Sequence, residues 1–335
     1  VTQTTPITAG RLTGSSGSTT VLTNAGNSIS ALGDYAAATG LYLSTSGPLA
    51  VDGNVVTSSL NLTSQGNIVV TGDITATAGM YANAASFSIG NGGTTGSVTG
   101  DINSNGPVTF NRSNNLSYSG TLSGVGSLNK TGSGTLTLTS GNSYSGGTTI
   151  SQGVLAIGSA TALGTGSVEI TGNAELRGVA DLNVGNVVQL SGGSTISASA
   201  GTTLRLTGDI YYDGLNIGSA GQTGIVDIAS NAGGYLVGSA LRVNYGTLRV
   251  SGGWLPAAAT SFASATVSLG ATLDLNDQTN ASLPLNNLQG EGRVRTGTQA
   301  TTGLGVNSGN FLGVIEGAGQ LRKISGGTLA LGGAD

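Results

Sequence analysis

Two pairs of closely spaced aspartates are the residues of this chain that come nearest to catalytic machinery. Asp209 and Asp213 lie in GDIYYDG, and Asp274 and Asp277 lie in LDLND. Carboxylates clustered on one face of a protein can cleave polysaccharides, either as an acid and base pair or together with a bound Ca²⁺. Aspartates are also common where strands end in turns, since their side chains bond to nearby backbone groups. We expect this second, structural role for both pairs.

The residue inventory excludes most other catalytic sites. The chain contains no histidine and no cysteine, so Ser-His-Asp triads, Cys-His pairs and the commonest zinc sites cannot be assembled from it. Calcium-binding nonapeptides of the GGxGxD type are absent as well. The 15 acidic and 11 basic residues give a net charge of −4, which argues against a nucleic acid partner. We therefore expect no catalytic residue, no metal and no cofactor.

Aromatic side chains offer a second kind of chemistry, the binding of a ligand. The candidate ligand-binding residues gather in one stretch of the chain: Tyr211, Tyr212, Tyr235, Tyr245 and Trp254. Because neighbouring side chains of a strand point to opposite faces, Tyr211 and Tyr212 cannot both face inward. An exposed aromatic track could stack on sugar rings or bind a protein partner. Buried rings would instead stack on one another inside the protein.

The elements that must position these residues are short strands. Leu, Val and Ile alternate with Thr and Ser in brief runs such as TTLRLTGDI (202–210), and no segment has the 3.6-residue apolar period of a helix. Gly, Asn, Asp or Ser interrupt the runs at intervals of about 8–12 residues. The 60 glycines follow no Gly-X-Y period, which excludes collagen, and the low charge content of 8 % argues against disorder.

Strand spacing of this kind permits a β-sandwich, a β-barrel or a solenoid. A sandwich or barrel normally closes within about 200–250 residues, whereas a solenoid can continue coil upon coil. The length of 335 residues favours the solenoid. We predict an all-β fold, a right-handed parallel β-helix of roughly 16 coils at about 20 residues per coil, with essentially no α-helix. Without disulfides, the stacked aliphatic core must hold the chain together.

One sequence phrase occurs twice and defines a repeat. The residues that define the first copy each reappear 193 positions later, the distance from Gly124 to Gly317, although Ile324 stands where the first copy has Thr131. The residues that define the repeat are Gly124, Gly126, Leu128, Lys130, Gly134, Leu136 and Leu138 in the first copy, and Gly317, Gly319, Leu321, Lys323, Gly327, Leu329 and Leu331 in the second.

The lysine of the repeat poses a physical problem. If SLNK were a straight strand, Lys130 would share the inward face of Leu128, and an unpaired ammonium group in the core is very costly. We therefore predict that the chain bends at 130–134, and likewise at 323–327, so that the head of each lysine reaches solvent. Exposed lysine is the ordinary case in proteins.

The repeat resembles a known family. Residues 124–170 (GVGSLNKTGSGTLTLTSGNSYSGGTTISQG and onward) look like the passenger-associated repeat of bacterial autotransporters, the type V secretion family. The segment 270–294 is similar to the lead-in of such a repeat, and the first hundred residues resemble the coils of filamentous-haemagglutinin-like adhesins. From these resemblances we expect one continuous solenoid that is a fragment of a longer protein. It would consist of haemagglutinin-like coils (1–115), a first repeat (116–170), further coils (171–307) and a second, truncated repeat (308–335).

The resemblance implies a location and a role. Such a passenger is exported across the outer membrane of a Gram-negative bacterium and is displayed or released outside, in contact with the membrane only through a C-terminal barrel that this sequence lacks. We expect a non-catalytic structural or adhesive stalk, with roles in cell adhesion and biofilm formation. Its partners would be a glycan or protein of a host or bacterial surface, or further copies of itself. The alternatives are an extracellular filament subunit that polymerises end to end, and a polysaccharide-active enzyme.

Overall fold

Every regular element of the described chain is a β-strand. The computed structural model describes residues 1–229, 240–251, 264–276, 282–299 and 303–332. These residues contain no helix and wind into a parallel β-solenoid of about 15 coils, close to the roughly 16 predicted. The chain forms two compact units, Val1–Leu155 with Thr161–Gly166, and Ala156–Ala160 with Ser167–Asp335. The predicted four-part division along the sequence stays a prediction.

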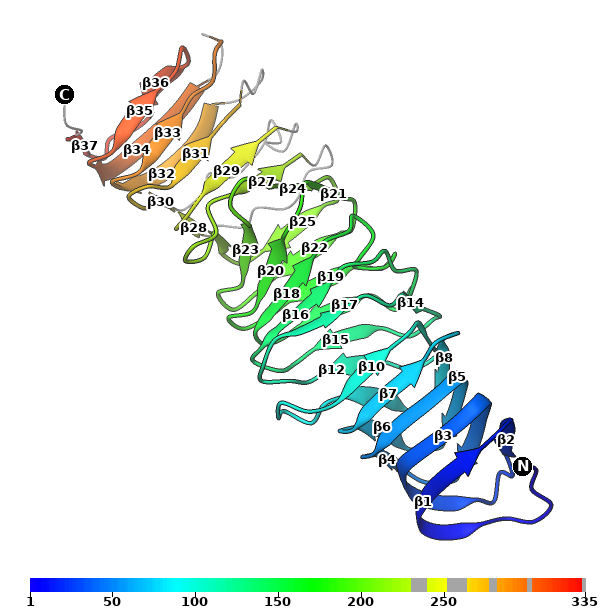
Figure 1. Ribbon diagram of the computed structural model, residues 1–335. Coiled ribbons are helices and arrows are strands. Elements are labelled where there is room, and N and C mark those ends of the chain that lie inside the picture. The colour runs from blue at the N-terminus through cyan, green and yellow to red at the C-terminus, as the bar shows by residue number, and fades with distance from the viewer. Residues whose placement is uncertain (230–239, 252–263, 277–281, 300–302, 333–335) are drawn as a thin grey trace. The chain divides into compact units, whose positions relative to one another are not determined.

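Most strands of the first unit have two to four residues, whereas β1, β3 and β5 have 9, 18 and 11 (Figure 1). Their bounds are β1 Thr8–Ser16, β2 Thr19–Leu22, β3 Ser28–Thr45, β4 Leu49–Val51, β5 Asn54–Ser64, β6 Asn67–Val70, β7 Asp73–Ala76, β8 Met80–Asn83, β9 Ser86–Ile89, β10 Ser97–Thr99, β11 Ile102–Ser104, β12 Val108–Phe110, β13 Leu116–Tyr118, β14 Leu122–Ser123, β15 Leu128–Lys130, β16 Thr135–Leu138 and β17 Thr148–Ile150, with β18 Val154–Ile157 next along the chain.

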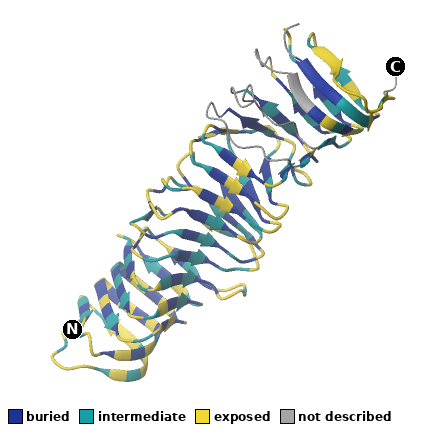
Figure 2. Ribbon diagram, turned by 180° about the vertical axis from the view of Figure 1, so that it is seen from behind, coloured by how far each residue is buried: buried dark blue, intermediate teal, exposed yellow. Residues whose placement is uncertain are grey.

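Strands of successive coils pair in parallel and in register. In the first unit β12 pairs with β15, which pairs with β17, so that Val108, Leu128 and Thr148 are neighbours. This step of 20 residues confirms the predicted length of a coil. Buried and less buried positions alternate along the strands because successive side chains point to opposite faces of a sheet (Figure 2).

The core of the first unit consists of side-chain columns that cross the coils. One column contains, from coil to coil, Leu32, Val51, Val70, Ile89, Phe110, Lys130 and Ile150. Each of these side chains is buried. The apolar members confirm the expected stack of like side chains, and Lys130 stands among them as a charged exception.

The second unit arranges its strands in three parallel sheets. Its elements are β19 Val168–Ile170, β20 Glu175–Gly178, β21 Leu182–Val184, β22 Val188–Leu190, β23 Thr195–Ala198, β24 Thr203–Leu206, β25 Ile210–Tyr212, β26 Leu215–Ile217, β27 Ile225–Ile228, β28 Ala240–Val243, β29 Thr247–Val250, β30 Ser264–Val267, β31 Thr272–Asp274, β32 Ser282–Gly290, β33 Arg293–Arg295, β34 Gly303–Phe311, β35 Val314–Glu316, β36 Gln320–Lys323 and β37 Leu329–Leu331.

One coil of the second unit shows how the three sheets are built. β19, β20 and β21 follow one another along the chain and pair in parallel with β22, β23 and β24 of the next coil. Val168, Leu176 and Val184, one from each strand, have no exposed surface. Three sides of each such coil therefore face a common core.

Glycine occurs where neighbouring coils come closest. A Cβ atom on Gly132 would lie 2.1 Å from the backbone oxygen of Arg112, and one on Gly134 would lie 2.1 Å from that of Asn114. No side chain fits at such a distance, so the corner of the coil requires glycine there. Close approach of the backbones explains part of the high glycine content.

Candidate functional site

Lys130 is buried, and the prediction that its head reaches solvent is wrong. The lysine is the last residue of β15 and is 2 % exposed, on the inward face that it shares with Leu128. The chain does bend, but only over 132–134, after the lysine has already entered the core. The prediction failed because it treated the ammonium group as unpaired.

Two backbone carbonyl groups compensate the buried ammonium group. Lys130 Nζ donates a hydrogen bond to the carbonyl oxygen of Gly132 in its own coil and one, at 3.0 Å, to that of Gln152 in the next coil. The backbone of Lys130 also accepts a hydrogen bond from the N–H of Ser151, at 2.9 Å. Burial still lowers the pKa of Lys130 from 10.5 to about 8. The lysine thus links two coils at a corner.

Three further polar side chains of the repeat lie inside the fold. The Asn142 side chain accepts a hydrogen bond from the N–H of Leu122 at 2.7 Å and donates one to the carbonyl of Ala162 at 2.6 Å. These partners lie one coil before and one coil after it. The hydroxyl groups of Tyr144 and Thr148 are 2.6 Å apart, and burial raises the pKa of Tyr144.

We call Lys130, Asn142, Tyr144 and Thr148 the repeat cluster. Sequence reasoning singled out the lysine but missed the other three residues. Their even spacing, at positions 142, 144 and 148 of GNSYSGGTT, was the available signal, because residues an even number apart on an extended chain share a face.

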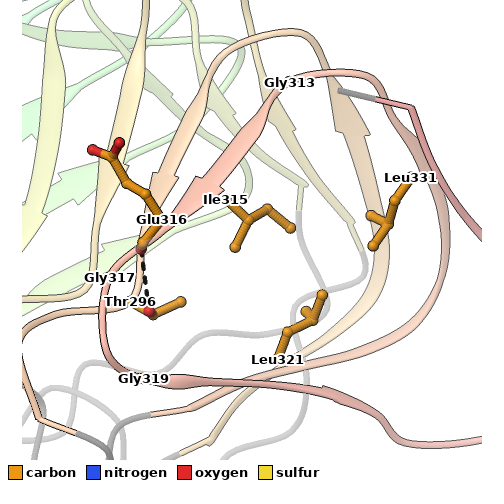
Figure 3. Close-up of a pocket in the computed structure, with 8 residues that line it drawn as sticks. All are labelled: Thr296, Gly313, Ile315, Glu316, Gly317, Gly319, Leu321 and Leu331. Atoms are coloured by element: carbon orange, nitrogen blue, oxygen red, sulfur yellow. Dashed lines mark hydrogen bonds between the residues drawn. The ribbon is translucent and has the colours of Figure 1, made fainter. Parts of the chain in front are cut away.

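The second copy of the repeat reproduces the lysine contact in an exposed setting. Lys323 Nζ donates to the carbonyl oxygen of Ser325, two residues on, as Lys130 does to Gly132. Lys323 is the last residue of β36 and is exposed, as predicted for its head. A cavity of about 380 Å³ lies beside this strand, and Ile315, Leu321 and Leu331 point into it (Figure 3). The counterparts of these two leucines in the first copy, Leu128 and Leu138, are buried.

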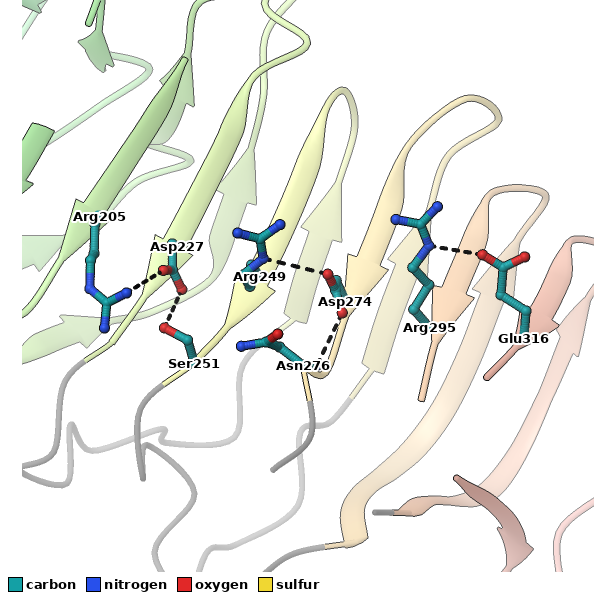
Figure 4. A network of polar contacts seen from close by, with 8 residues as sticks. All are labelled: Arg205, Asp227, Arg249, Ser251, Asp274, Asn276, Arg295 and Glu316. Atoms are coloured by element: carbon teal, nitrogen blue, oxygen red, sulfur yellow. Dashed lines mark hydrogen bonds and ion pairs between the residues drawn. The ribbon is translucent and has the colours of Figure 1, made fainter. Parts of the chain in front are cut away.

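The second unit carries a column of alternating charges, one per coil, which we call the charge ladder (Figure 4). Its members are register neighbours on β24, β27, β29, β31, β33 and β35: Arg205, Asp227, Arg249, Asp274, Arg295 and Glu316. Ion pairs join Arg205 to Asp227 at 3.1 Å, Arg249 to Asp274 at 3.5 Å and Arg295 to Glu316 at 2.8 Å.

Two acidic members of the charge ladder, Asp227 and Glu316, differ in burial. Asp227 is 2 % exposed, and its carboxylate also accepts a hydrogen bond from the Ser251 hydroxyl at 2.6 Å. Glu316 is more exposed, and hydrogen bonds from Arg293 and Arg295 lower its pKa to about 2. Sequence reasoning missed the ladder, because its members are 21 to 25 residues apart and only the register brings them together.

The candidate carboxylate pairs have different surroundings. Asp274 belongs to the charge ladder, while Asp277 lies outside the described residues. Asp209 is half-buried and Asp213 exposed, on either side of β25. Within the described ranges, no group of three or more acidic side chains is placed to hold a metal ion. A catalytic role for these aspartates stays untested.

The aromatic candidates do not share one strand ladder in the described chain. Tyr211 is 37 % exposed and Tyr212 is buried, as alternation on β25 requires. Tyr245 is exposed in the connection between β28 and β29, which belong to two other sheets. Tyr235 and Trp254 lie outside the described residues. Ligand binding by this set stays a prediction.

Comparison with known proteins identifies one segment. Residues 128–157 match the family model of the passenger-associated-transport-repeat, which confirms the resemblance stated for this part of the chain. The repeat is typical of autotransporter passengers, and the parallel β-solenoid fits such a passenger. Searches of curated proteins and of solved structures find no match. In the described ranges, no helix has the length and apolar character needed to cross a membrane.

Proposed function

We propose that this chain is part of the passenger of a bacterial autotransporter, secreted or displayed at the cell surface, and that it is a non-catalytic stalk with an adhesive surface. The observation that carries the proposal is the matched repeat at 128–157, whose strands belong to a stack of parallel coils. Each coil in such a stack rests on its neighbours, so the fold can extend binding surface without a globular core.

The outward side chains support an adhesive surface. Strands β9, β12, β15 and β17 contribute Ile89, Phe110, Lys130 and Ile150 to the core column. The residue before each of these faces outward, and the resulting outward column contains Ser88, Thr109, Asn129 and Thr149. These side chains are uncharged and can both donate and accept hydrogen bonds. The absence of histidine and cysteine from the sequence supports the non-catalytic part of the proposal.

Labelling of intact cells tests the location. An antibody raised against residues 1–335 should label unpermeabilised cells of the producing bacterium or detect the chain in the medium, and external protease should remove the cell-bound label. Label that appears only after permeabilisation contradicts the proposal.

Incubation with polysaccharides tests the non-catalytic part of the proposal. The purified chain should release no reducing ends or unsaturated products, and reproducible release would favour the polysaccharide-active enzyme.

Association between copies is a second candidate function, and the exposed leucines of the second repeat copy favour it. Leu331 is 53 % exposed beside the cavity described above, and β35, β36 and β37 each pair with a described strand on one side. A second copy could cover these apolar side chains. Sedimentation of the purified chain at increasing concentration tests this association, with the end-to-end filament as the alternative.

A further inference from the structure

One outward column of the first unit alternates tyrosine and asparagine. Tyr42, Asn61, Tyr81 and Asn103 are register neighbours on β3, β5, β8 and β11. We call them the Tyr–Asn column. Tyr42 is 37 % exposed, Asn61 and Tyr81 are half-buried, and Asn103 is exposed. None of these residues belongs to the repeat cluster or to the aromatic set of the second unit.

The column lies in a groove of about 310 Å³, which Asp101 also lines. Gly40 leaves room for the Tyr42 ring, and Gly79 lines the groove. A Cβ atom on Gly40 would lie 3.0 Å from the Tyr42 ring, and Gly79 has a φ of +93°, which side chains rarely adopt. Both Tyr42 and Tyr81 line this groove.

Two polar contacts order the groove. Asn105 Nδ2 donates a hydrogen bond of 2.5 Å to the Tyr81 hydroxyl, which holds that ring in place. Asp101 accepts a hydrogen bond of 2.7 Å from the backbone N–H of Thr121 and so is fixed at the rim. A ring that is already ordered loses little conformational entropy when a ligand stacks on it.

The spacing of the column selects a class of ligand. Successive coils are about 4.8 Å apart, so Tyr42 and Tyr81, two coils apart, are separated by roughly 9.6 Å. Two linked pyranose rings have a similar length. Each sugar presents C–H groups that stack on an aromatic face, and hydroxyl groups that both donate to and accept from an amide. A straight column of alternating rings and amides therefore matches an extended sugar chain.

We propose that the Tyr–Asn column binds a linear, neutral polysaccharide, with a sugar ring on each tyrosine and hydrogen bonds to Asn61 and Asn103. Asp101 at the rim disfavours anionic sugars, as does the net charge of −4. This inference deepens the proposed adhesive function, on which its biological meaning rests.

Affinity electrophoresis of the full chain tests the proposal. Native gels should contain hydroxyethyl cellulose as the neutral probe, or carboxymethyl cellulose, which has the same backbone with anionic groups. We expect retardation in the first gel and none in the second. Tyr42→Ala and Tyr81→Ala should each weaken the apparent affinity about fivefold, since one aromatic contact contributes about 1 kcal/mol. Asn103→Leu, at an exposed position that the fold does not need, should weaken it as well.

Val179→Ala is the matched control, because Val179 and Tyr42 are equally exposed at 37 % and Val179 does not line the groove. It should leave the retardation unchanged. An unretarded parent chain, or an equal loss in Val179→Ala, overturns the proposal. Surface labelling would be unaffected by either result, so failure of the sugar site is distinguishable from failure of the passenger assignment.

Discussion

Lys130 illustrates how a single residue can satisfy opposing requirements. Its neighbours in the core column are Phe110 and Ile150, yet its ammonium group bonds to the carbonyl oxygens of Gly132 and Gln152. A buried charge is tolerated where such bonds replace those to water. The lowered pKa shows that the compensation is incomplete.

This incomplete compensation predicts a pH dependence of stability. The pKa of Lys130 is about 8 in the folded chain, against 10.5 without burial. Folding disfavours the protonated form of Lys130. The destabilisation caused by its buried charge is therefore fully present below pH 8 and disappears as the pH approaches 10.5. We expect the free energy of unfolding to rise over this window, relative to Lys130→Met, by on the order of 2 kcal/mol. Urea unfolding of both proteins at several pH values measures this.

Lys323→Met is the matched control, since it removes an exposed lysine at the same position of the second repeat copy. It should show no such difference from the parent protein. If the curves for the parent protein and Lys130→Met ran parallel from pH 7 to 10.5, the buried amine would not be the titrating group.

At the scale of elements, close packing of the corners constrains the sequence most strongly. We expect Gly132→Ala to lower the free energy of unfolding by about 3 kcal/mol, because the added Cβ would lie 2.1 Å from a backbone oxygen and the coils would have to separate. Gly47→Ala, where no atom lies within 4 Å, should change the free energy of unfolding by less than about 1 kcal/mol. Equal effects of the two substitutions would refute this account of the glycine content.

The charge ladder favours one register of the coils. If each strand paired with the strand two coils away instead of with its neighbour, Arg249 would lie opposite Arg205 and Asp274 opposite Asp227. Like charges in facing positions destabilise a sheet. Pairing with the strand three coils away would restore the alternation. The ladder therefore disfavours the nearest wrong pairing in the second unit.

Burial predicts which member of the charge ladder contributes most. Asp227→Ala should cost about 2–3 kcal/mol, because it removes a buried carboxylate that accepts bonds from Arg205 and Ser251. Asp274→Ala should cost about 1 kcal/mol or less, since its ion pair with Arg249 is longer and its carboxylate is more exposed than that of Asp227. Thermal unfolding at low and high salt provides the comparison. A larger effect at Asp274 would show that burial does not decide the contribution.

At the scale of the whole molecule, the exposed leucines of the second repeat copy predict association. Sedimentation velocity at increasing concentration should show pairs of the parent chain and weaker pairing for Leu321→Thr combined with Leu331→Thr. Thr suits strands while it removes apolar surface from the cavity. Leu128 and Leu138, the counterparts in the first copy, cannot provide the control because they are buried and their replacement would unfold the core. Val125→Thr replaces an exposed apolar residue instead, and it should leave the association unchanged. A monomer at every concentration would contradict this expectation.

The sequence alone determined the class of fold, because alternation of apolar and hydroxyl residues fixes strands and the recurrence of short strands fixes a stack of coils. It also determined the repeat, whose residues reappear in order, and it excluded catalysis by histidine or cysteine. Only the tertiary structure decided that Lys130 is buried, that Arg205 and Asp227 pair, and that Tyr42 and Tyr81 border one groove. These facts depend on register between coils about 20 residues apart, and local residue preferences do not encode which side chain lies above which.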